Sequence, residues 1–215
     1  MSRVKICGLS RDEDIVAVNN AMPDYAGFVF APSRRQIDEK KAGLFKGRLD
    51  PRIRAVGVFV NQEIELAAGL YRNGVIDLVQ LHGDEDAEYI AKLKGQCGCP
   101  VIKAFGIRDT LPVLTEKSDY CLFDSMSNER GGTGKGFDWN ILKGYCGLPY
   151  FLAGGLDAVN IPGAIRLLSP FCIDVSSGAE TDGRKDAGKI CEIVSLVRQQ
   201  TKITAFGRGY AGGGE

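Results

Sequence analysis

Two residue types suited to proton transfer end short apolar segments: Cys7 ends residues 4–7 (VKIC), and Asp124 ends residues 121–124 (CLFD). Side chains alternate across a β-strand, so Lys5 shares a face with Cys7, and Leu122 shares one with Asp124. A cysteine base and an aspartic acid facing one cavity can move protons between substrate atoms, as an isomerase does. We expect Lys5 to stabilise the thiolate and lower the pKa of Cys7 towards neutrality. The alternatives are an inert buried thiol and a loop-capping aspartate.

The same alternation turns three further polar side chains towards the predicted interior: Gln80, His82 and Asp174. His82 is the single histidine of the chain, and we expect it to contact the substrate. The alternative is a structural histidine whose hydrogen bonds are satisfied within the protein.

Glycine is the one excess in the composition, with 28 of 215 residues, against an average usage of about 7%. It clusters at residues 131–136 (GGTGKG), at 154–155 and in Ser176-Ser177-Gly178. Each cluster follows an apolar run, where backbone N–H groups can hold a phosphate. The Walker A pattern fails at positions 129 and 136, and the dinucleotide fingerprint fails in its last spacing. The sequence therefore predicts a phosphate ester as substrate and supports neither ATP nor NAD.

The elements that must position these residues alternate along the chain. Apolar, β-branched runs occupy residues 4–8, 25–30, 53–60, 78–83, 101–107, 119–125, 150–156 and 172–178. Helix-compatible segments occupy residues 11–22, 38–47, 62–73, 85–95, 109–117, 138–146, 159–168 and 186–201. Eight strand–helix units predict one α/β domain, a (β/α)8 TIM barrel over residues 1–202, with an open doubly wound sheet as the alternative. The glycine-rich residues 203–215 are expected to form a mobile tail.

Composition excludes several classes of protein. Lys plus Arg equals Asp plus Glu at 27 each without a basic block, so no nucleic-acid partner is expected. No window reaches eighteen apolar residues, and the first residues lack a signal-peptide pattern, so neither a membrane association nor secretion is expected. Seven dispersed cysteines indicate reduced thiols in the cytoplasm. Cys97 and Cys99 are half of a zinc motif, but one histidine cannot complete it, so no metal is expected.

Eight short motifs occur in order along the chain: KICGL (5–9), GFVF (27–30), SRR (33–35), VGVFV (56–60), QLHGDE (80–85), GGTGKGFDW (131–139), AGGL (153–156) and DVSSG (174–178). This set resembles the phosphoribosylanthranilate isomerases, from residue 4 to about residue 201. The resemblance implies the third step of tryptophan biosynthesis. That step is an Amadori rearrangement of N-(5′-phosphoribosyl)anthranilate to 1-(o-carboxyphenylamino)-1-deoxyribulose 5-phosphate. It also implies that no cofactor or metal is needed.

The resemblance gives roles to residues already singled out. Asp124 would be the general acid that protonates the ribose ring oxygen, and Cys7 the general base that removes the C2′ proton. Arg35 would pair with the anthranilate carboxylate, although a short loop leaves Arg34 as an alternative. The phosphate would lie among Gly132, Gly155, Ser177 and Gly178, with Asp174 close to the sugar hydroxyls. The implied partner is this phosphorylated sugar–anthranilate substrate, and the protein would be a monomer or homodimer.

The sequence is compatible with two rival functions. A Schiff-base lyase would use Lys5 or Lys103 as an inward nucleophile, and a sugar-phosphate epimerase would need metal-binding histidines that the chain lacks. A phosphate-ligand binder without catalysis is the second rival, but Cys7 and Asp124 are both present. The sequence does not decide whether a histidine-pathway substrate is also accepted.

Overall fold

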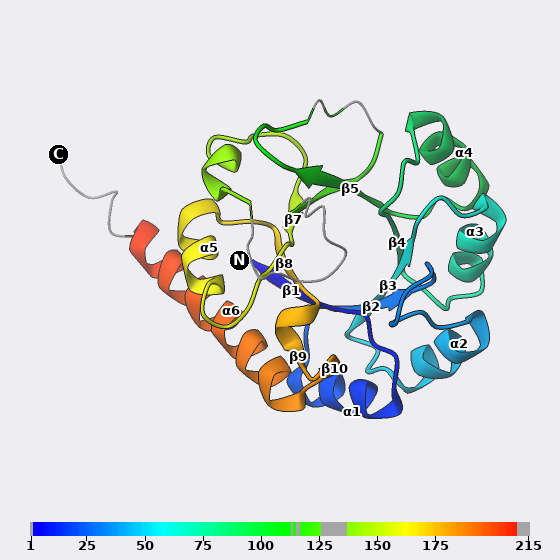
Figure 1. The fold of residues 1–215 in the computed structure, drawn as a ribbon, viewed down its shortest axis with the longest axis horizontal. Coiled ribbons are helices and arrows are strands. Elements are labelled where there is room, and N and C mark those ends of the chain that lie inside the picture. Colours follow the sequence, from blue (N-terminus) through cyan, green and yellow to red (C-terminus); the bar gives the residue numbers. More distant parts are fainter. Residues whose placement is uncertain (1, 113, 115–116, 126–136, 210–215) are drawn as a thin grey trace.

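The computed structural model describes residues 2–112, 114, 117–125 and 137–209. Within them, eight parallel strands form a closed barrel in sequence order, with helices around the outside (Figure 1). The strands are β1 (Arg3–Cys7), β2 (Tyr25–Val29), β3 (Arg54–Phe59), β4 (Leu78–Leu81), β5 (Val101–Ile107), β6 (Tyr120–Ser125), β7 (Tyr150–Leu152) and β8 (Cys172–Val175). Pairing of β1 with both β2 and β8 closes the barrel and excludes the open sheet. The predicted (β/α)8 barrel is confirmed.

The helices are α1 (Asp12–Ala21), α2 (Glu39–Arg48), α3 (Ile64–Arg72), α4 (Ala87–Cys97), α5 (Ile161–Leu168) and α6 (Ala187–Gly209). Two 3₁₀ turns, η1 (Trp139–Leu142) and η2 (Ser177–Ala179), and a short hairpin, β9 (Glu180–Thr181) with β10 (Arg184–Lys185), complete the described elements. Local caps fix several helix ends: the side chain of Asp86 accepts a hydrogen bond from the N–H of Tyr89 at the start of α4. That helix ends at Gly98, whose φ of 65° suits glycine.

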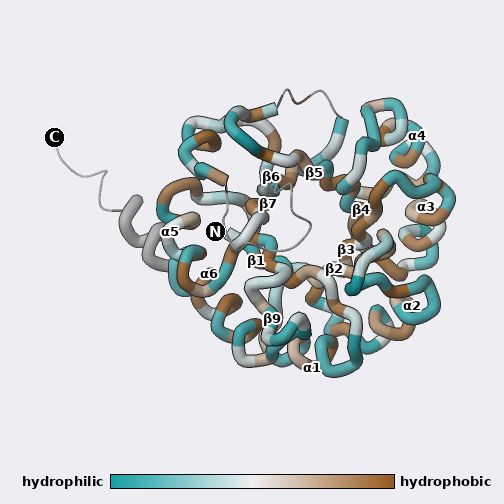
Figure 2. The backbone as a smooth tube through the Cα atoms, viewed as in Figure 1, coloured by the Kyte–Doolittle hydropathy of each residue, from teal (hydrophilic) through white to brown (hydrophobic). Residues whose placement is uncertain are grey.

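Two apolar cores hold the barrel. The larger lies between the strands and the helices and includes Val4 and Ile6. The smaller fills the barrel below the pocket and includes Leu122 and Phe151. In Figure 2, hydrophobic residues follow the strands, while hydrophilic residues gather on the outer helical turns and loops. Burying each such side chain contributes about 1.5–3 kcal/mol, so the polar side chains among them need partners of their own.

Two predicted helices are not formed as expected. The described part of residues 109–117 contains no helix, and residues 138–146 shorten to η1. Pro112 disfavours the helical conformation of Leu111 before it. Gly144, at a φ of 78°, breaks the second segment two residues after η1 ends. Sequence patterns that fit a helix were therefore overruled by proline and glycine.

The last helix is longer than the sequence predicted. α6 reaches Gly209, so residues 203–209, which we assigned to the tail, are helical. This helix packs against α1 and α5. Residues 210–215 lie outside the described part, and mobility of the tail stays a prediction. Among the described residues, no helix is long and apolar enough to cross a bilayer.

Candidate active site

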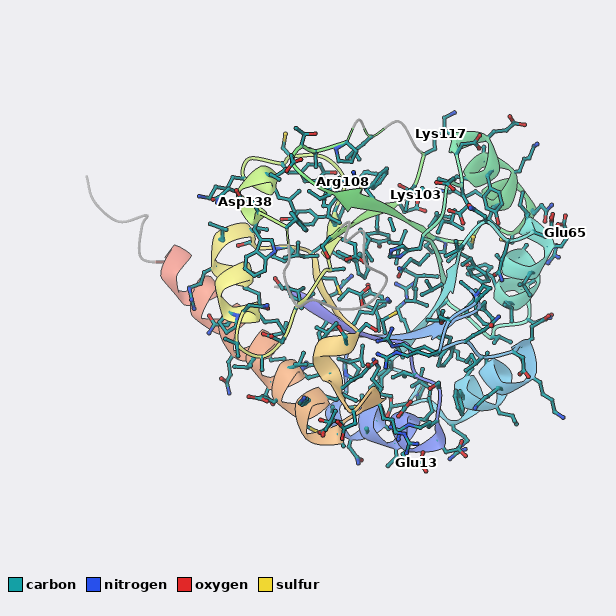
Figure 3. All side chains as sticks on the ribbon, viewed as in Figure 1. Glu13, Glu65, Lys103, Arg108, Lys117 and Asp138 are labelled. Carbon is teal, nitrogen blue, oxygen red and sulfur yellow. The ribbon has the colours of Figure 1, made fainter. Side chains whose placement is uncertain are left out.

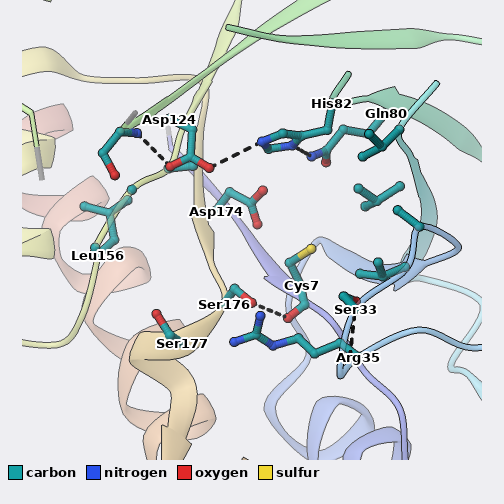
Figure 4. Close-up of a pocket in the computed structure, with 18 of the residues that line it drawn as sticks. Cys7, Ser33, Arg35, Gln80, His82, Asp124, Leu156, Asp174, Ser176 and Ser177 are labelled. Atoms are coloured by element: carbon teal, nitrogen blue, oxygen red, sulfur yellow. Dashed lines mark hydrogen bonds and ion pairs between the residues drawn. The ribbon is translucent and has the colours of Figure 1, made fainter. Parts of the chain in front are cut away.

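A cavity of about 420 Å³ opens at the carboxyl ends of the strands (Figure 4). It brings together these predicted site residues: Cys7, Arg35, His82, Asp124, Gly155, Asp174 and Ser177. Gly178 is not among the lining residues, and Gly132 lies outside the described part of the chain. Chemistry at this face is usual for the fold because eight loops converge there.

Cys7 stands at the end of β1, above a buried ion pair. Lys5 Nζ and Asp174 Oδ2 are 2.8 Å apart, on neighbouring strands in register. Burial opposes the charged form of Lys5, but the attraction of Asp174 and Cys7 outweighs it and raises the lysine pKa. Lys5 therefore lies beneath the thiol as a charged, paired group.

Our expectation that the pKa of Cys7 would fall towards neutrality is wrong. Burial raises the pKa of the thiol, and although the Lys5 charge lowers it, the Asp174 charge raises it further. Burial therefore outweighs the effect of Lys5, and the charge of Asp174 opposes that of Lys5. At rest Cys7 is therefore a thiol.

Gly27 makes the room that Cys7 occupies. The two residues face each other across the β1–β2 ladder. A Cβ on Gly27 would lie 2.8 Å from Cys7 Sγ and 2.9 Å from its Cα. Sequence reasoning did not single out this residue, although a glycine inside a strand is a signal of close approach.

Asp124, the last residue but one of β6, lies on the other side of the pocket and faces a histidine. His82 Nε2 lies 3.5 Å from Asp124 Oδ2, and His82 Nδ1 lies 3.0 Å from Gln80 Nε2 (Figure 4). Asp124 Oδ1 accepts a hydrogen bond from the N–H of Ser125 at 2.7 Å. Both Asp124 and His82 are about one-third exposed, so a ligand in the pocket can reach them.

Arg35 extends from the loop after β2 into the pocket, and a carboxylate binds its guanidinium group. Its Nε and Nη2 donate to the two oxygens of Glu180 at 2.7 and 3.0 Å. Arg34 also donates to Glu180, but its side chain is 55% exposed against 24% for Arg35, and it does not line the cavity. The aliphatic part of the Arg35 side chain crosses Gly8, where an added Cβ would clash with Arg35 Cδ.

Glu180 is a site residue that the sequence analysis missed. Besides the two arginines it accepts a hydrogen bond from Lys185 Nζ at 2.7 Å. Burial opposes its ionisation, but the hydrogen bonds from Arg35 and Lys185 outweigh it and lower its pKa to about 2. Three cations around one carboxylate leave excess positive charge at this edge of the pocket, which favours an anionic ligand.

The loops after β7 and β8 supply backbone donors. Gly154 and Gly155 have φ values of 87° and 65°, which favour glycine. Within the described residues, the N–H groups of Gly155 and Ser177 have no acceptor. A Cβ on Gly178 would lie 2.0 Å from the carbonyl oxygen of Leu156, so this glycine lets the two loops meet.

Lys103, which we expected to point into the barrel, points the other way. Its neighbours Ile102 and Ala104 belong to the inner core. Lys103 Nζ donates to the Gly83 carbonyl at 2.6 Å and to Glu85 at 3.1 Å, outside the barrel wall (Figure 3). It does not line the cavity and so is no candidate for Schiff-base chemistry there.

Comparison with known proteins agrees with this geometry. The family model of N-(5′-phosphoribosyl)anthranilate isomerase matches residues 4–196. The chain belongs to this family. It is 50% identical over 199 residues to the isomerase of Endomicrobium trichonymphae, covering 92% of this chain and 99% of that protein. It is 44% identical to that of Clostridium acetobutylicum, covering 93% and 99%.

Solved isomerase structures have the same fold. The crystal structure of phosphoribosyl anthranilate isomerase from Thermotoga maritima matches with a TM-score of 0.80 and 34% identity, covering 93% of this chain and all of that one. A phosphoribosyl anthranilate isomerase in complex with reduced 1-(o-carboxyphenylamino)-1-deoxyribulose 5-phosphate matches with a TM-score of 0.77 and 31% identity, over the same shares. The family was correctly identified from the sequence motifs.

Metal ligands do not gather in the described part of the molecule. No group of three or more histidine, cysteine, aspartate or glutamate side chains is placed there to hold an ion. The pocket presents instead a thiol, carboxylates, one histidine and one guanidinium, which are groups for proton transfer and anion binding.

Proposed function

We propose that Asp124 and Cys7 are the general acid and the general base of this isomerase. The enzyme catalyses the Amadori rearrangement of N-(5′-phosphoribosyl)anthranilate to 1-(o-carboxyphenylamino)-1-deoxyribulose 5-phosphate, the third step of tryptophan biosynthesis. The observation that carries the assignment is one cavity that holds a thiol and a carboxylate, on β1 and β6, between groups suited to anions.

The proposed chemistry moves two protons. Asp124 protonates the ribose ring oxygen, the C1′–O bond opens, and the anilino nitrogen becomes a Schiff base. That iminium ion makes the C2′ proton acidic, and the thiolate of Cys7 removes it to give an enolamine. The enolamine then tautomerises to the ketose. Each such group typically contributes about 10²–10⁴ in rate.

Anionic groups of the substrate would bind at opposite polar features. Arg35 suits the planar anthranilate carboxylate, because it lines the cavity and Glu180 accepts only from its Nε and Nη2. The backbone N–H groups of Gly155 and Ser177 suit the phosphate. Gly132 and Gly178 remain predicted members of this cradle, Gly178 through its backbone alone.

Asp174 would bind a sugar hydroxyl. Its Oδ2 is held by Lys5, while Oδ1 is buried and has no partner among the described residues. A buried carboxylate oxygen without a donor is costly, and a hydroxyl group of the ribose chain would supply one. His82, beside Asp124, is placed to contact the same substrate.

The test is turnover, followed by the fluorescence decay of phosphoribosylanthranilate. Cys7→Ala and Asp124→Asn should each lower kcat by at least about 10²-fold while product affinity stays nearly unchanged. Circular dichroism checks that both variants fold. Near-normal turnover in either variant would refute the assignment of that residue.

Two further expectations concern the cellular setting. All seven cysteines are free thiols, which supports the cytoplasm as compartment. Monomer and homodimer are both compatible with the fold, and one matching Thermotoga maritima structure is of monomers generated from a dimeric isomerase. Size-exclusion chromatography with light scattering distinguishes the two states.

A further inference from the structure

Gln80 contacts the histidine that faces the proposed acid, on the side of the ring away from Asp124 (Figure 4). The residue is 1% exposed and precedes His82 by two positions, and both side chains point to the inner side of the barrel, where they line the cavity. Gln80 Nε2 and His82 Nδ1 are 3.0 Å apart. An amide nitrogen can only donate, so Nδ1 must accept. The proton of the neutral ring is thereby on Nε2, the nitrogen that faces Asp124 Oδ2 at 3.5 Å.

The contact is specific to one tautomer of the ring. A proton on Nδ1 would point at the N–H group of Gln80, so the Nδ1–H tautomer would lose this hydrogen bond and gain a repulsion. Its Nε2 would then present a lone pair to Asp124 in place of an N–H group.

A neutral Nε2–H group has a different effect on the acid. It points a dipole at the oxygen on which negative charge develops once Asp124 has given its proton away. The other oxygen already accepts the N–H of Ser125 at 2.7 Å. Each oxygen of the resulting carboxylate therefore faces one donor, and neither donor carries a full charge.

We propose that Gln80 is a positioning residue of the isomerase, which fixes the Nε2–H tautomer of His82 so that Asp124 can carry and release its proton. This inference rests on the proposed role of Asp124 as the acid. Gln80 lines the cavity, and in this role it acts on the acid through the imidazole ring of His82.

The chain offers an unusually clean measurement, because it contains a single histidine. In protein without a histidine tag, labelled with ¹⁵N at histidine, the two ring nitrogens give the only histidine signals. At neutral pH the wild type should show an unprotonated Nδ1 and a protonated Nε2. The opposite tautomer, or a doubly protonated ring, would overturn the proposal.

Gln80→Glu replaces the donor by an acceptor of nearly the same shape. It should move a proton onto Nδ1, seen in the ¹⁵N spectrum, and lower kcat by at least about tenfold, because Nε2 then no longer offers an N–H group to the carboxylate that Asp124 becomes. KM should change less than about threefold. Gln80→Met removes donor and acceptor without adding charge, and should give a mixture of tautomers with a smaller loss of kcat.

Gln62→Glu is the matched control. Gln62 donates to the carbonyl of Phe30 and does not line the active-site cavity, so its variant should keep the wild-type histidine spectrum and kcat. A changed spectrum with unchanged kcat in both Gln80 variants would overturn the proposal. If Asp124→Asn stays active, the acid assignment itself fails, and the spectrum still reports independently whether Gln80 sets the tautomer.

Discussion

Replacing Arg35 tests whether Arg35 or Arg34 binds the anthranilate carboxylate. Arg35 lines the cavity and Arg34 does not, although both donate to Glu180. A hydrogen bond to a charged group contributes about 1.5–3 kcal/mol, which corresponds to roughly 10- to 150-fold in Kd. Arg35→Ala should therefore weaken binding of reduced product by that factor. The fold should survive, because Glu180 keeps Lys185 and Arg34 as partners.

The assay is calorimetric titration with two ligands. One is reduced 1-(o-carboxyphenylamino)-1-deoxyribulose 5-phosphate, and the other is the same molecule without its carboxyl group. Arg35→Ala should weaken the first and leave the second within about twofold, since only the first loses a charge pair. Arg34→Ala is the matched control and should affect neither by more than about twofold. An equal loss for both ligands, or a loss in Arg34→Ala instead, would refute this placement.

Three further outcomes follow from the site. Because burial raises the pKa of Cys7 above its ordinary value, thiolate is the minor form at neutral pH, and kcat/KM should rise from pH 7 towards pH 9; a flat profile would contradict Cys7 as base. Gly155→Ala, at a φ of 65°, should raise KM several-fold, whereas Gly95→Ala in open space on α4 should not; equal KM values would remove Gly155 from the phosphate site. Lys5→Met should lower the free energy of unfolding by about 3–5 kcal/mol, because it leaves Asp174 buried and unpaired; urea titration measures it, and a loss below 1 kcal/mol would contradict the argument.

Period-two alternation placed most of the site correctly. Along β1, Val4 and Ile6 belong to the outer core while Lys5 is inside, as predicted. Along β5 it failed for Lys103, because both faces of a barrel strand are apolar and the sequence does not mark which one is inner. The partner that holds Lys103 outside, Glu85, becomes its neighbour only once β4 and β5 pair side by side.

Other errors came from interactions between distant segments. Glu180 is a single acidic residue in a turn-rich stretch, and nothing local shows that Arg35, 145 positions away, would fold onto it. The pKa of Cys7 was misjudged for a related reason. The lysine two residues earlier was visible, but the burial of the thiol, which is the largest cause of its raised pKa, and the opposing charge of Asp174 on β8 arise only in the folded barrel.

The raised pKa of Cys7 is compatible with its work as a base. A thiol with a higher pKa is ionised in fewer molecules, but each thiolate is a stronger base towards carbon acids. The C2′ proton becomes acidic only after Asp124 has opened the ring. Cys7 therefore has to be ionised only at that stage of the reaction. What the pocket must provide is a thiolate without water around it, next to an iminium charge. Burial raises the thiol pKa, and the paired charges of Lys5 and Asp174 lie beneath the sulfur. The surroundings of Cys7 on β1 therefore favour a thiolate that is a strong base but is present in few molecules, over a weaker base that is ionised in most of them.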